Sequence, residues 1–249
     1  MIAILVPVLG RAHQIQPLIE SVHAGTESEH RIVFVCSPKD PATKVCQGSG
    51  ETTIVTNWSP GPGDFAKKIN LAYRKTDEPW LFQGATDLHF HEGWDTRALT
   101  VATRENVGVV GTNDLGNPLV VRGLHATHIL FSREYIETYG GTFDGTGAVF
   151  SETYDHQYVD TEFIQIAKSR GQFRPCLRSI VEHLHPHWDK GEMDDTYEKA
   201  MRATRPDAAL HVGRMRRYKV VAAREEAAEK RKERAVNKSY RQQQRRRRM

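Results

Sequence analysis

The sequence predicts an α/β fold, a mostly parallel sheet with flanking helices, followed by a basic C-terminal tail. Two apolar runs, Ile2–Val6 and Arg31–Cys36, are continuous rather than alternating, as strands buried on both faces require. Between them, apolar residues recur at helical spacing from Ile15 to Val22. A strand, a helix and a second strand in this order predict a right-handed βαβ unit, and therefore a parallel sheet.

The same alternation continues to about residue 190. Asp64 is a plausible N-cap for a helix that turns Phe65 and Ile69 inward, and Gly171 follows another helix as a terminating residue. Residues 142–157 are rich in Gly and Thr and are predicted to form a mobile loop. The predicted strands are residues 2–6, 31–36, 53–56, 80–90, 107–110, 119–121, 125–131 and 178–185, and the predicted helices are 13–23, 64–75, 93–103, 133–139, 159–170 and 196–203.

Charge divides the chain unevenly. Residues 214–249 hold 15 Lys and Arg against 4 Asp and Glu, a net charge of +11, which leaves about −7 of the total of +4 for residues 1–213. We expect a domain over 1–193, a connecting helical segment over 194–213, and a basic tail over 214–249. Within the tail, 219–236 suits a helix with Glu/Arg pairs, and 242–249 is predicted to be disordered.

Cysteine usage and the N-terminus indicate a cytoplasmic protein. Cys36, Cys46 and Cys176 form no CxxC motif and cannot all pair, as is typical of a reduced compartment. The apolar run near Met1 has no basic residues before it and is too short for a signal peptide or a membrane span. We therefore expect no membrane association.

The stretch Trp80–Phe90 carries the strongest chemical signal. It begins as an apolar strand, breaks at Gly84 and ends in polar residues. Residues two apart on an extended strand share a face, so Asp87 and His89 are expected to point the same way and to hold one divalent cation. In isolation, Asp-x-His more often means a turn Asp followed by a half-buried His.

Polar segments follow three of the predicted strands. In open α/β sheets, ligands bind beyond the carboxyl ends of the strands. The segments 7–11, 37–40 and 87–89 lie at such ends, so we expect them to converge on one cleft.

Several short motifs then occur in a characteristic order over roughly residues 1–190. They are Val6-Pro7-Val8 with Arg11, Gly84–His89, Gly93-Trp94, Gly140-Gly141, Asp160–Phe163, Gly171 and Val181–His185. Through them the chain resembles the GT-A glycosyltransferases, closest to the family 2 type, and in particular the short phage-encoded members. The resemblance implies a Rossmann-like sheet that binds a nucleotide-sugar.

The resemblance also implies a metal site. Asp87 and His89 stand where the family has Asp-x-Asp, and Asp-x-His is similar to the variant in polypeptide GalNAc-transferases. An imidazole ligand suits Mn²⁺ better than Mg²⁺, although either cation is expected to serve. The family often draws a third ligand from the late strand, where His183 and His185 are candidates and His185 is preferred. The alternative is that both cap a loop or pack under Trp188.

Asp160 occupies the place of the family's catalytic base at the start of a helix, where it would take the proton of the acceptor hydroxyl in an inverting transfer. Asp155 and Glu162 are the fallback bases, and the alternative for Asp160 is an N-cap.

The donor is expected to be a nucleotide-sugar, with a UDP-sugar favoured. The second strand lacks the family's usual acidic ending, which leaves recognition of the base open. The two lysines of the 64–75 helix, Lys67 and Lys68, could instead be a solvated helix face. The residues expected to border the donor, in part from the resemblance, are Pro7, Val8, Arg11, Ser37, Asp40, Lys68, Asn70, Thr86, Asp87, Asn113 and Asp114.

Three functions of different classes follow. The first is a metal-dependent glycosyltransferase without the Gln-x-x-Arg-Trp motif of processive synthases. Its acceptor could be hydroxymethylated bases of phage DNA bound by the basic tail, in the host cytoplasm, or virion proteins; the tail could also be only a solubilising end. The second is a metal-dependent hydrolase, and the third is a non-catalytic basic binding module. The histidines that could form a hydrolytic site are His89, His91, His183, His185 and His187.

Overall fold

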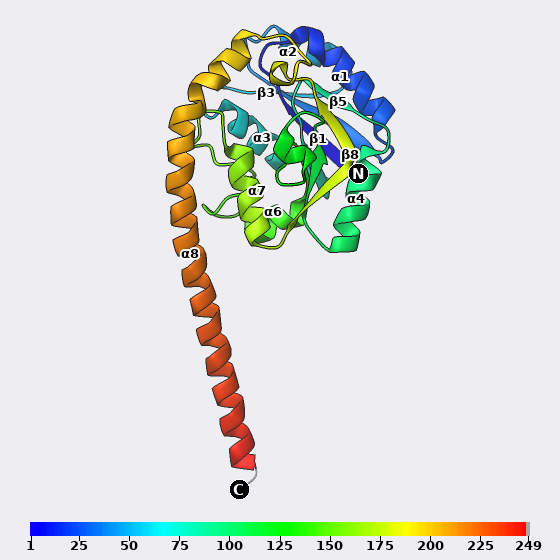
Figure 1. Cartoon of the computed structure of the whole chain (residues 1–249). Helices are drawn as coiled ribbons and strands as arrows, with labels where there is room; N and C mark the ends of the chain where they lie inside the picture. The colour runs from blue at the N-terminus through cyan, green and yellow to red at the C-terminus, as the bar shows by residue number, and fades with distance from the viewer. Residues whose placement is uncertain (248–249) are drawn as a thin grey trace. The chain divides into compact units, whose positions relative to one another are not determined.

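The computed structural model describes residues 1–247, in which eight strands form one mixed sheet (Figure 1). The order of the strands across the sheet is β3-β2-β1-β4-β7-β6-β8-β5. The strands are β1 (Ile2–Pro7), β2 (His30–Cys36), β3 (Thr52–Val55), β4 (Trp80–Gln83), β5 (Leu88–Phe90), β6 (Val109–Asn113), β7 (Ile129–Ser132) and β8 (Phe173–His183). The helices are α1 (Ala12–Gly25), α2 (Ala42–Gly48), α3 (Asp64–Arg74), α4 (Trp94–Glu105), α5 (Pro118–Val121), α6 (Arg133–Tyr139), α7 (Val159–Ser169), the 3₁₀ turn η1 (Pro186–Trp188) and α8 (Asp195–Arg247).

Helices cover both faces of β1. Ile2, Ile4 and Val6 belong to a hydrophobic cluster that also contains residues of α1, α2 and α4. The alternate residues, Ala3 and Leu5, are equally buried, and α3 packs against β1 and β2. This arrangement confirms that the continuous apolar runs are strands buried on both faces.

The first four strands in the sequence run parallel, which confirms the predicted βαβ opening. β7 then enters antiparallel between β4 and β6, with Phe82 of β4 opposite Leu130. Because β7 runs against β4, its first residue lies at the carboxyl end of β4. The segment that precedes β7 therefore reaches the same edge of the sheet as Asp87.

The predicted strand over residues 80–90 is in fact two strands. β4 ends at Gln83, the chain turns at Thr86 and Asp87, and β5 pairs antiparallel with β8 instead. Gly84 passes so close to β1 that an added Cβ would lie 3.1 Å from the carbonyl oxygen of Leu5. The close approach to β1 and the turn separate the two halves of the stretch, so the single-strand prediction is wrong.

Two other local predictions also fail. Residues 119–121 form the short helix α5 instead of a strand, because Pro118 is its first residue and the side chain of Asn117 accepts the N–H of Leu119 as an N-cap. β8 begins at Phe173, earlier than expected, and α2 was not predicted.

The chain divides into two compact units, Met1–Ala208 and Ala209–Met249. The first turns of α8 belong to the first unit, so part of the predicted connecting segment folds with the sheet. The helix continues to Arg247, where disorder was predicted from 242 onward, and residues 248–249 lie outside the described part. Among residues 1–247, none of the helices is long and apolar enough to span a bilayer.

Candidate active site

A cavity of about 880 Å³ opens at the carboxyl ends of β1 and β4. Its wall contains residues of the expected segment 7–11 and, from the expected segment 87–89, Asp87 but not His89. No residue of the segment 37–40 lines it. The predicted site residues that line it are Pro7, Val8, Arg11, Lys68, Thr86, Asp87, Asp160, His183 and His185, and the fallback base Asp155 also lines it. The predicted site residues that lie outside its wall are Ser37, Asp40, Asn70, His89, Asn113 and Asp114.

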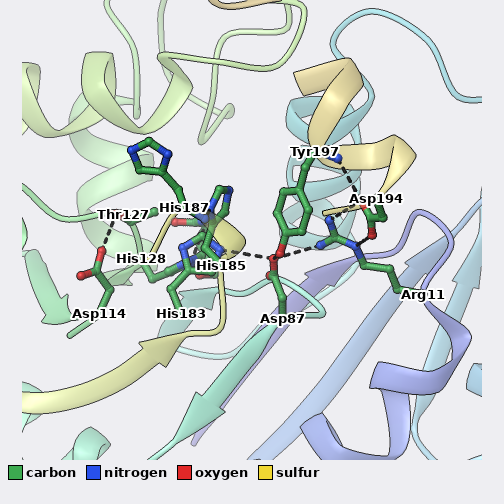
Figure 2. A network of polar contacts seen from close by, with 11 residues as sticks. Arg11, Asp87, Asp114, Thr127, His128, His183, His185, His187, Asp194 and Tyr197 are labelled. Carbon is green, nitrogen blue, oxygen red and sulfur yellow. Dashed lines mark hydrogen bonds and ion pairs between the residues drawn. The ribbon is translucent and has the colours of Figure 1, made fainter. Parts of the chain in front are cut away.

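Asp87 is the centre of a polar network at one end of the cavity (Figure 2). Its Oδ2 accepts hydrogen bonds from Arg11 Nη1 at 2.9 Å and from the hydroxyl of Tyr197, and His183 Nε2 lies 3.3 Å away. Burial alone would raise the pKa of this carboxyl. The neighbouring His183 and Arg11 and the Tyr197 hydroxyl outweigh burial and hold the pKa of Asp87 well below its usual range.

Arg11 is fixed by the turn that ends β1. Gly10 and Arg11 both adopt the left-handed conformation, with φ of 65° and 54°, and Asp40 accepts the N–H of Gly10 at 2.7 Å. The guanidinium donates to Asp194 at 2.6 and 3.0 Å and lies 3.8 Å from the centroid of the Tyr197 ring. Asp40 therefore supports this turn from outside the cavity.

His89 lies away from Asp87, which corrects the expected Asp-x-His ligand pair. Leu88 and Phe90 are buried on β5, so the pleat turns His89 outward, where it is exposed and opposite Glu182 of β8. Asp87 precedes this strand in a turn, so the face-sharing rule does not apply to the two residues.

His183, rather than the preferred His185, faces Asp87. The ring of His185 packs against Tyr197 with centroids 4.4 Å apart, and its Nδ1 accepts the N–H of His187 at 3.0 Å. Burial, with the nearby charge of His183, lowers the pKa of His185 to about 4. His185 therefore lies beside Tyr197 and the following turn, while His183 provides the nitrogen closest to the Asp87 carboxylate.

The geometry fits a cation whose remaining ligands come from a bound substrate. Among the described residues, no group of three or more His, Cys, Asp or Glu side chains is arranged to hold a metal ion. Arg11, His183 and Tyr197 all contact Oδ2 of the Asp87 carboxylate. A carboxylate and one imidazole, completed by phosphate oxygens and water, are a ligand set that Mn²⁺ and Mg²⁺ accept.

Asp160 stands at the first turn of α7 with His125 beside it. His125 Nε2 lies 3.4 Å from Asp160 Oδ2, and the N–H of Thr161 donates to Oδ1 at 2.7 Å. Burial favours the neutral acid, but the hydrogen bond and charge of His125 outweigh it and lower the pKa of Asp160. The N-cap of α7 is Tyr158, so the N-cap alternative for Asp160 is wrong.

The two fallback bases differ in their surroundings. Glu162 is buried and accepts a hydrogen bond from the hydroxyl of Tyr154 at 2.6 Å. The backbone of Asp155 is bonded on both sides, to the carboxylate of Asp207 and to the N–H of Gly63. Glu162 is therefore engaged inside the protein, whereas Asp155 and Asp160 both line the cavity.

Two residues of α3 that were predicted to border the nucleotide-sugar instead bond to other groups of the protein. Lys68 is fully buried, and its Nζ donates to the carbonyl oxygen of Val8 at 2.7 Å and pairs with Asp64 at 2.7 Å. The amide of Asn70 accepts the N–H groups of Val149 and Phe150 at 2.9 and 3.0 Å. Neither the solvated-face alternative for Lys68 nor a free Asn70 amide agrees with these contacts.

Asn113 and Asp114 hold the loop after β6. Asp114 accepts the N–H groups of Gly116 and Asn117 and the hydroxyl of Thr127 at 2.9–3.0 Å. Asn113 donates to the carbonyl oxygen of Leu177. These two residues therefore bond to the protein itself, while His125, Thr127 and His128 of the neighbouring segment line the cavity.

Four residues of the site were not predicted. His125 and His128 belong to the run His125-Ala126-Thr127-His128, whose spacing of histidines was a usable signal. Tyr197 and Asp194 lie more than a hundred residues beyond Asp87, in a segment whose sequence suggested only a connecting helix.

Comparisons with known proteins agree with this architecture. No model of a known protein family matches the sequence, and no curated protein sequence matches it. Glucosyl-3-phosphoglycerate synthase from Mycobacterium tuberculosis, crystallised with Mn²⁺, UDP-glucose and phosphoglyceric acid, superimposes with a TM-score of 0.59 at 12% identity, over 86% of this chain and 79% of that one.

Two further solved structures are similar to the chain. The mannosyltransferase PcManGT from Pyrobaculum calidifontis, in complex with GDP-Man and Mn²⁺, has a TM-score of 0.56 at 15% identity, over 85% of this chain and 74% of that one. Residues 1–349 of S. aureus TarS give a TM-score of 0.55 at 11% identity, over 72% of this chain and 59% of that one. The sheet order, the site at its edge and these similarities together show that the chain has the GT-A glycosyltransferase fold.

Proposed function

We propose that the protein is a metal-dependent glycosyltransferase that moves a sugar from a nucleoside diphosphate to a hydroxyl group. The observation that supports this most is a single cavity with Asp87, His183 and Arg11 in its wall together with Asp160 and His125. Similar folds have been crystallised with UDP-glucose or GDP-Man and Mn²⁺, which supports the same donor class here.

Asp87 and His183 would hold the Mn²⁺ or Mg²⁺ ion. A bound divalent cation neutralises the charge that develops on the departing diphosphate. Arg11, which already reaches Asp87, would donate to the same phosphate oxygens as a fixed positive charge. Tyr197 covers the carboxylate, so its hydroxyl has to move aside or share the site when the donor binds.

Asp160 would act as the base of an inverting transfer. Its carboxylate accepts the proton of the acceptor hydroxyl while that oxygen bonds to the anomeric carbon and the bond to the diphosphate breaks. His125, 3.4 Å from Asp160 Oδ2, would hold the carboxylate in place. The lowered pKa of Asp160 keeps it ionised and ready to accept a proton at neutral pH, so positioning rather than basicity must supply most of its effect.

The acceptor that we favour is a hydroxymethylated base in DNA. The net charge of +11 over residues 214–249 supports a polyanionic acceptor that binds through counterion release. Steep salt dependence of duplex binding, lost when residues 214–249 are deleted, is the expected result. Sugar transfer to a virion protein with no binding to DNA would favour the alternative acceptor.

A metal-dependent hydrolase is less well supported. Two of the five histidines considered for it, His89 and His91, lie outside the wall of the cavity.

The decisive experiment measures hydrolysis and transfer of UDP-glucose and GDP-mannose by the full chain, with Mn²⁺ and with EDTA. Donor turnover that requires Mn²⁺ and falls at least a hundredfold in Asp87→Ala is expected. His89→Ala is the matched control, since it changes the same motif outside the cavity and should retain activity. No donor binding in a thermal-shift assay with Mn²⁺, or equal loss in both variants, would refute the proposal.

A further inference from the structure

His128 and Gln83 present buried polar atoms without protein partners in the wall of the cavity. Both side chains are at most 3% exposed and both line the cavity. Among the described residues, no hydrogen-bond partner exists for Nε2 of His128 or for Oε1 of Gln83. Buried polar atoms are nearly always paired, so two adjacent exceptions in a cavity wall indicate a missing ligand.

The contacts of the imidazole limit what kind of group is missing. Nδ1 of His128 lies 3.2 Å from the carbonyl oxygen of Gln83, which can only accept, and 3.2 Å from the side-chain amide nitrogen of Gln83, which can only donate. These two contacts suit different tautomers, so Nε2 faces the cavity either as a lone pair or as an N–H. A hydroxyl group both donates and accepts, so it satisfies Nε2 in either tautomer and can also donate to Oε1 of Gln83.

The position of His128 places that hydroxyl between the two ends of the site. Its ring packs edge-on against His183, with centroids 5.0 Å apart, on the side of the cavity where Figure 2 shows the histidines opposite Arg11. His128 also lies three residues after His125, whose Nε2 is 3.4 Å from Asp160 Oδ2 at the other end of the site. The group transferred from the diphosphate to the acceptor has to occupy this interval.

We propose that His128, with Gln83 beside it, binds a hydroxyl group of the transferred sugar and so helps to select the donor. This inference rests on the proposed function and adds the contact that recognises the sugar rather than the nucleotide. The ligand class is a hexose with a free hydroxyl that hydrogen-bonds to Nε2 of His128. Oε1 of Gln83 accepts a hydrogen bond from the same or an adjacent hydroxyl.

The test compares a donor with its own nucleoside diphosphate. Affinities of UDP-glucose and UDP, and of GDP-mannose and GDP, are measured in Mn²⁺ by titration calorimetry. For the pair that binds, His128→Phe should weaken the nucleotide-sugar about three- to tenfold, as loss of one neutral hydrogen bond predicts, and leave the diphosphate unchanged. Gln83→Leu removes the second unpartnered atom and should also weaken binding of the nucleotide-sugar but not of the diphosphate. His89→Phe is the control outside the cavity.

A second arm uses the unaltered protein. A series of analogues of the bound nucleotide-sugar is used, each lacking one sugar hydroxyl. For one analogue, the wild-type affinity should be about as low as the affinity of His128→Phe for the complete nucleotide-sugar. The affinity for that analogue should not fall further in His128→Phe. Additive losses for every analogue would overturn the assignment.

The outcomes separate the inference from the function on which it rests. A variant that weakens UDP and UDP-glucose equally would make His128 a ligand of the cation or a structural residue, and it would overturn only the sugar contact. A wild type that binds none of the four compounds in Mn²⁺ would overturn both.

Discussion

The buried ion pair of Lys68 and Asp64 allows a test of whether Lys68 stabilises the fold or contacts the nucleotide-sugar donor. The side chains are 1% and 10% exposed, and Asp64 also accepts a hydrogen bond from Trp58 Nε1 at 2.9 Å. Removing one member of a buried pair leaves the other charge uncompensated, which typically costs about 3–5 kcal/mol. Lys68→Met should therefore lower the free energy of unfolding by that amount, and Asp64→Asn by a similar amount.

The double variant should cost much less than the sum. Once both charges are gone, the main remaining loss is the unpaired carbonyl oxygen of Val8, about 1–3 kcal/mol. We therefore expect a coupling energy of at least about 2 kcal/mol in a double-mutant cycle. The assay is urea unfolding of the full chain at neutral pH, with the slope of the transition checked for constancy across variants.

Lys67→Met is the matched control. This lysine is adjacent in sequence, but its Nζ reaches only the carbonyl oxygen of Pro62 in an exposed contact, so its loss should change stability by less than about 0.5 kcal/mol. The reasoning fails if Lys68→Met is as stable as the control, or if the two single losses simply add. A stable Lys68→Met that no longer binds the diphosphate would restore the sequence-based view of Lys68 as a phosphate ligand.

Three further perturbations test other features. In EDTA, acidification from pH 7 should destabilise the protein, because burial and His183 lower the pKa of His128 from 6.5 to about 4. Between these two pH values the imidazole is protonated in the unfolded chain but not in the folded one. The free energy of unfolding should therefore fall by on the order of 3 kcal/mol as the pH drops through this window. Urea unfolding across pH should show a shallower loss in His128→Gln, and an identical slope would contradict the assignment. Asp207→Ala should cost about 2–4 kcal/mol in chemical unfolding, since the backbone N–H groups of residues 155–157 lose their carboxylate acceptor; a change below about 1 kcal/mol would count against this role. Gly141→Ala should cost more than about 3 kcal/mol or prevent folding, because its Cβ would lie 1.9 Å from the carbonyl oxygen of Val149, whereas Gly48→Ala, in open space on a helix, should shift the thermal midpoint only slightly and upward.

The sequence was sufficient wherever a local pattern had one structural solution. Continuous apolar runs predicted β1 and β2, and helical spacing predicted α1. Asp87 was found because a polar residue after a buried strand lies at the ligand-binding edge of such a sheet. Asp160 was expected at the start of a helix from the family resemblance, and it lies in the first turn of α7 beside the cavity.

Predictions failed where a distant contact overrides the local pattern. Asp87 and His89 were expected on one face, but the approach of Gly84 to β1 converts one apparent strand into two. A one-residue change of register reverses the face of every later side chain, so His89 points away from Asp87. Tyr197 could not be found from Asp87, since the two are 110 residues apart and no periodic signal connects them. The orphaned nitrogen of His128 likewise depends on β7 entering the sheet in reverse.

The bidentate pairing of Arg11 with Asp194 has a consequence for synthesis of the protein. The two residues are 183 positions apart, so the arginine near the start of the chain finds this partner only after nearly the whole domain has left the ribosome. Until then the first strands can assemble, but the Asp87 carboxylate lacks the hydrogen bond from the Tyr197 hydroxyl. Nascent or proteolytically shortened chains that stop before position 194 should therefore contain a sheet with an open pocket, and protease protection of that pocket should appear last during translation.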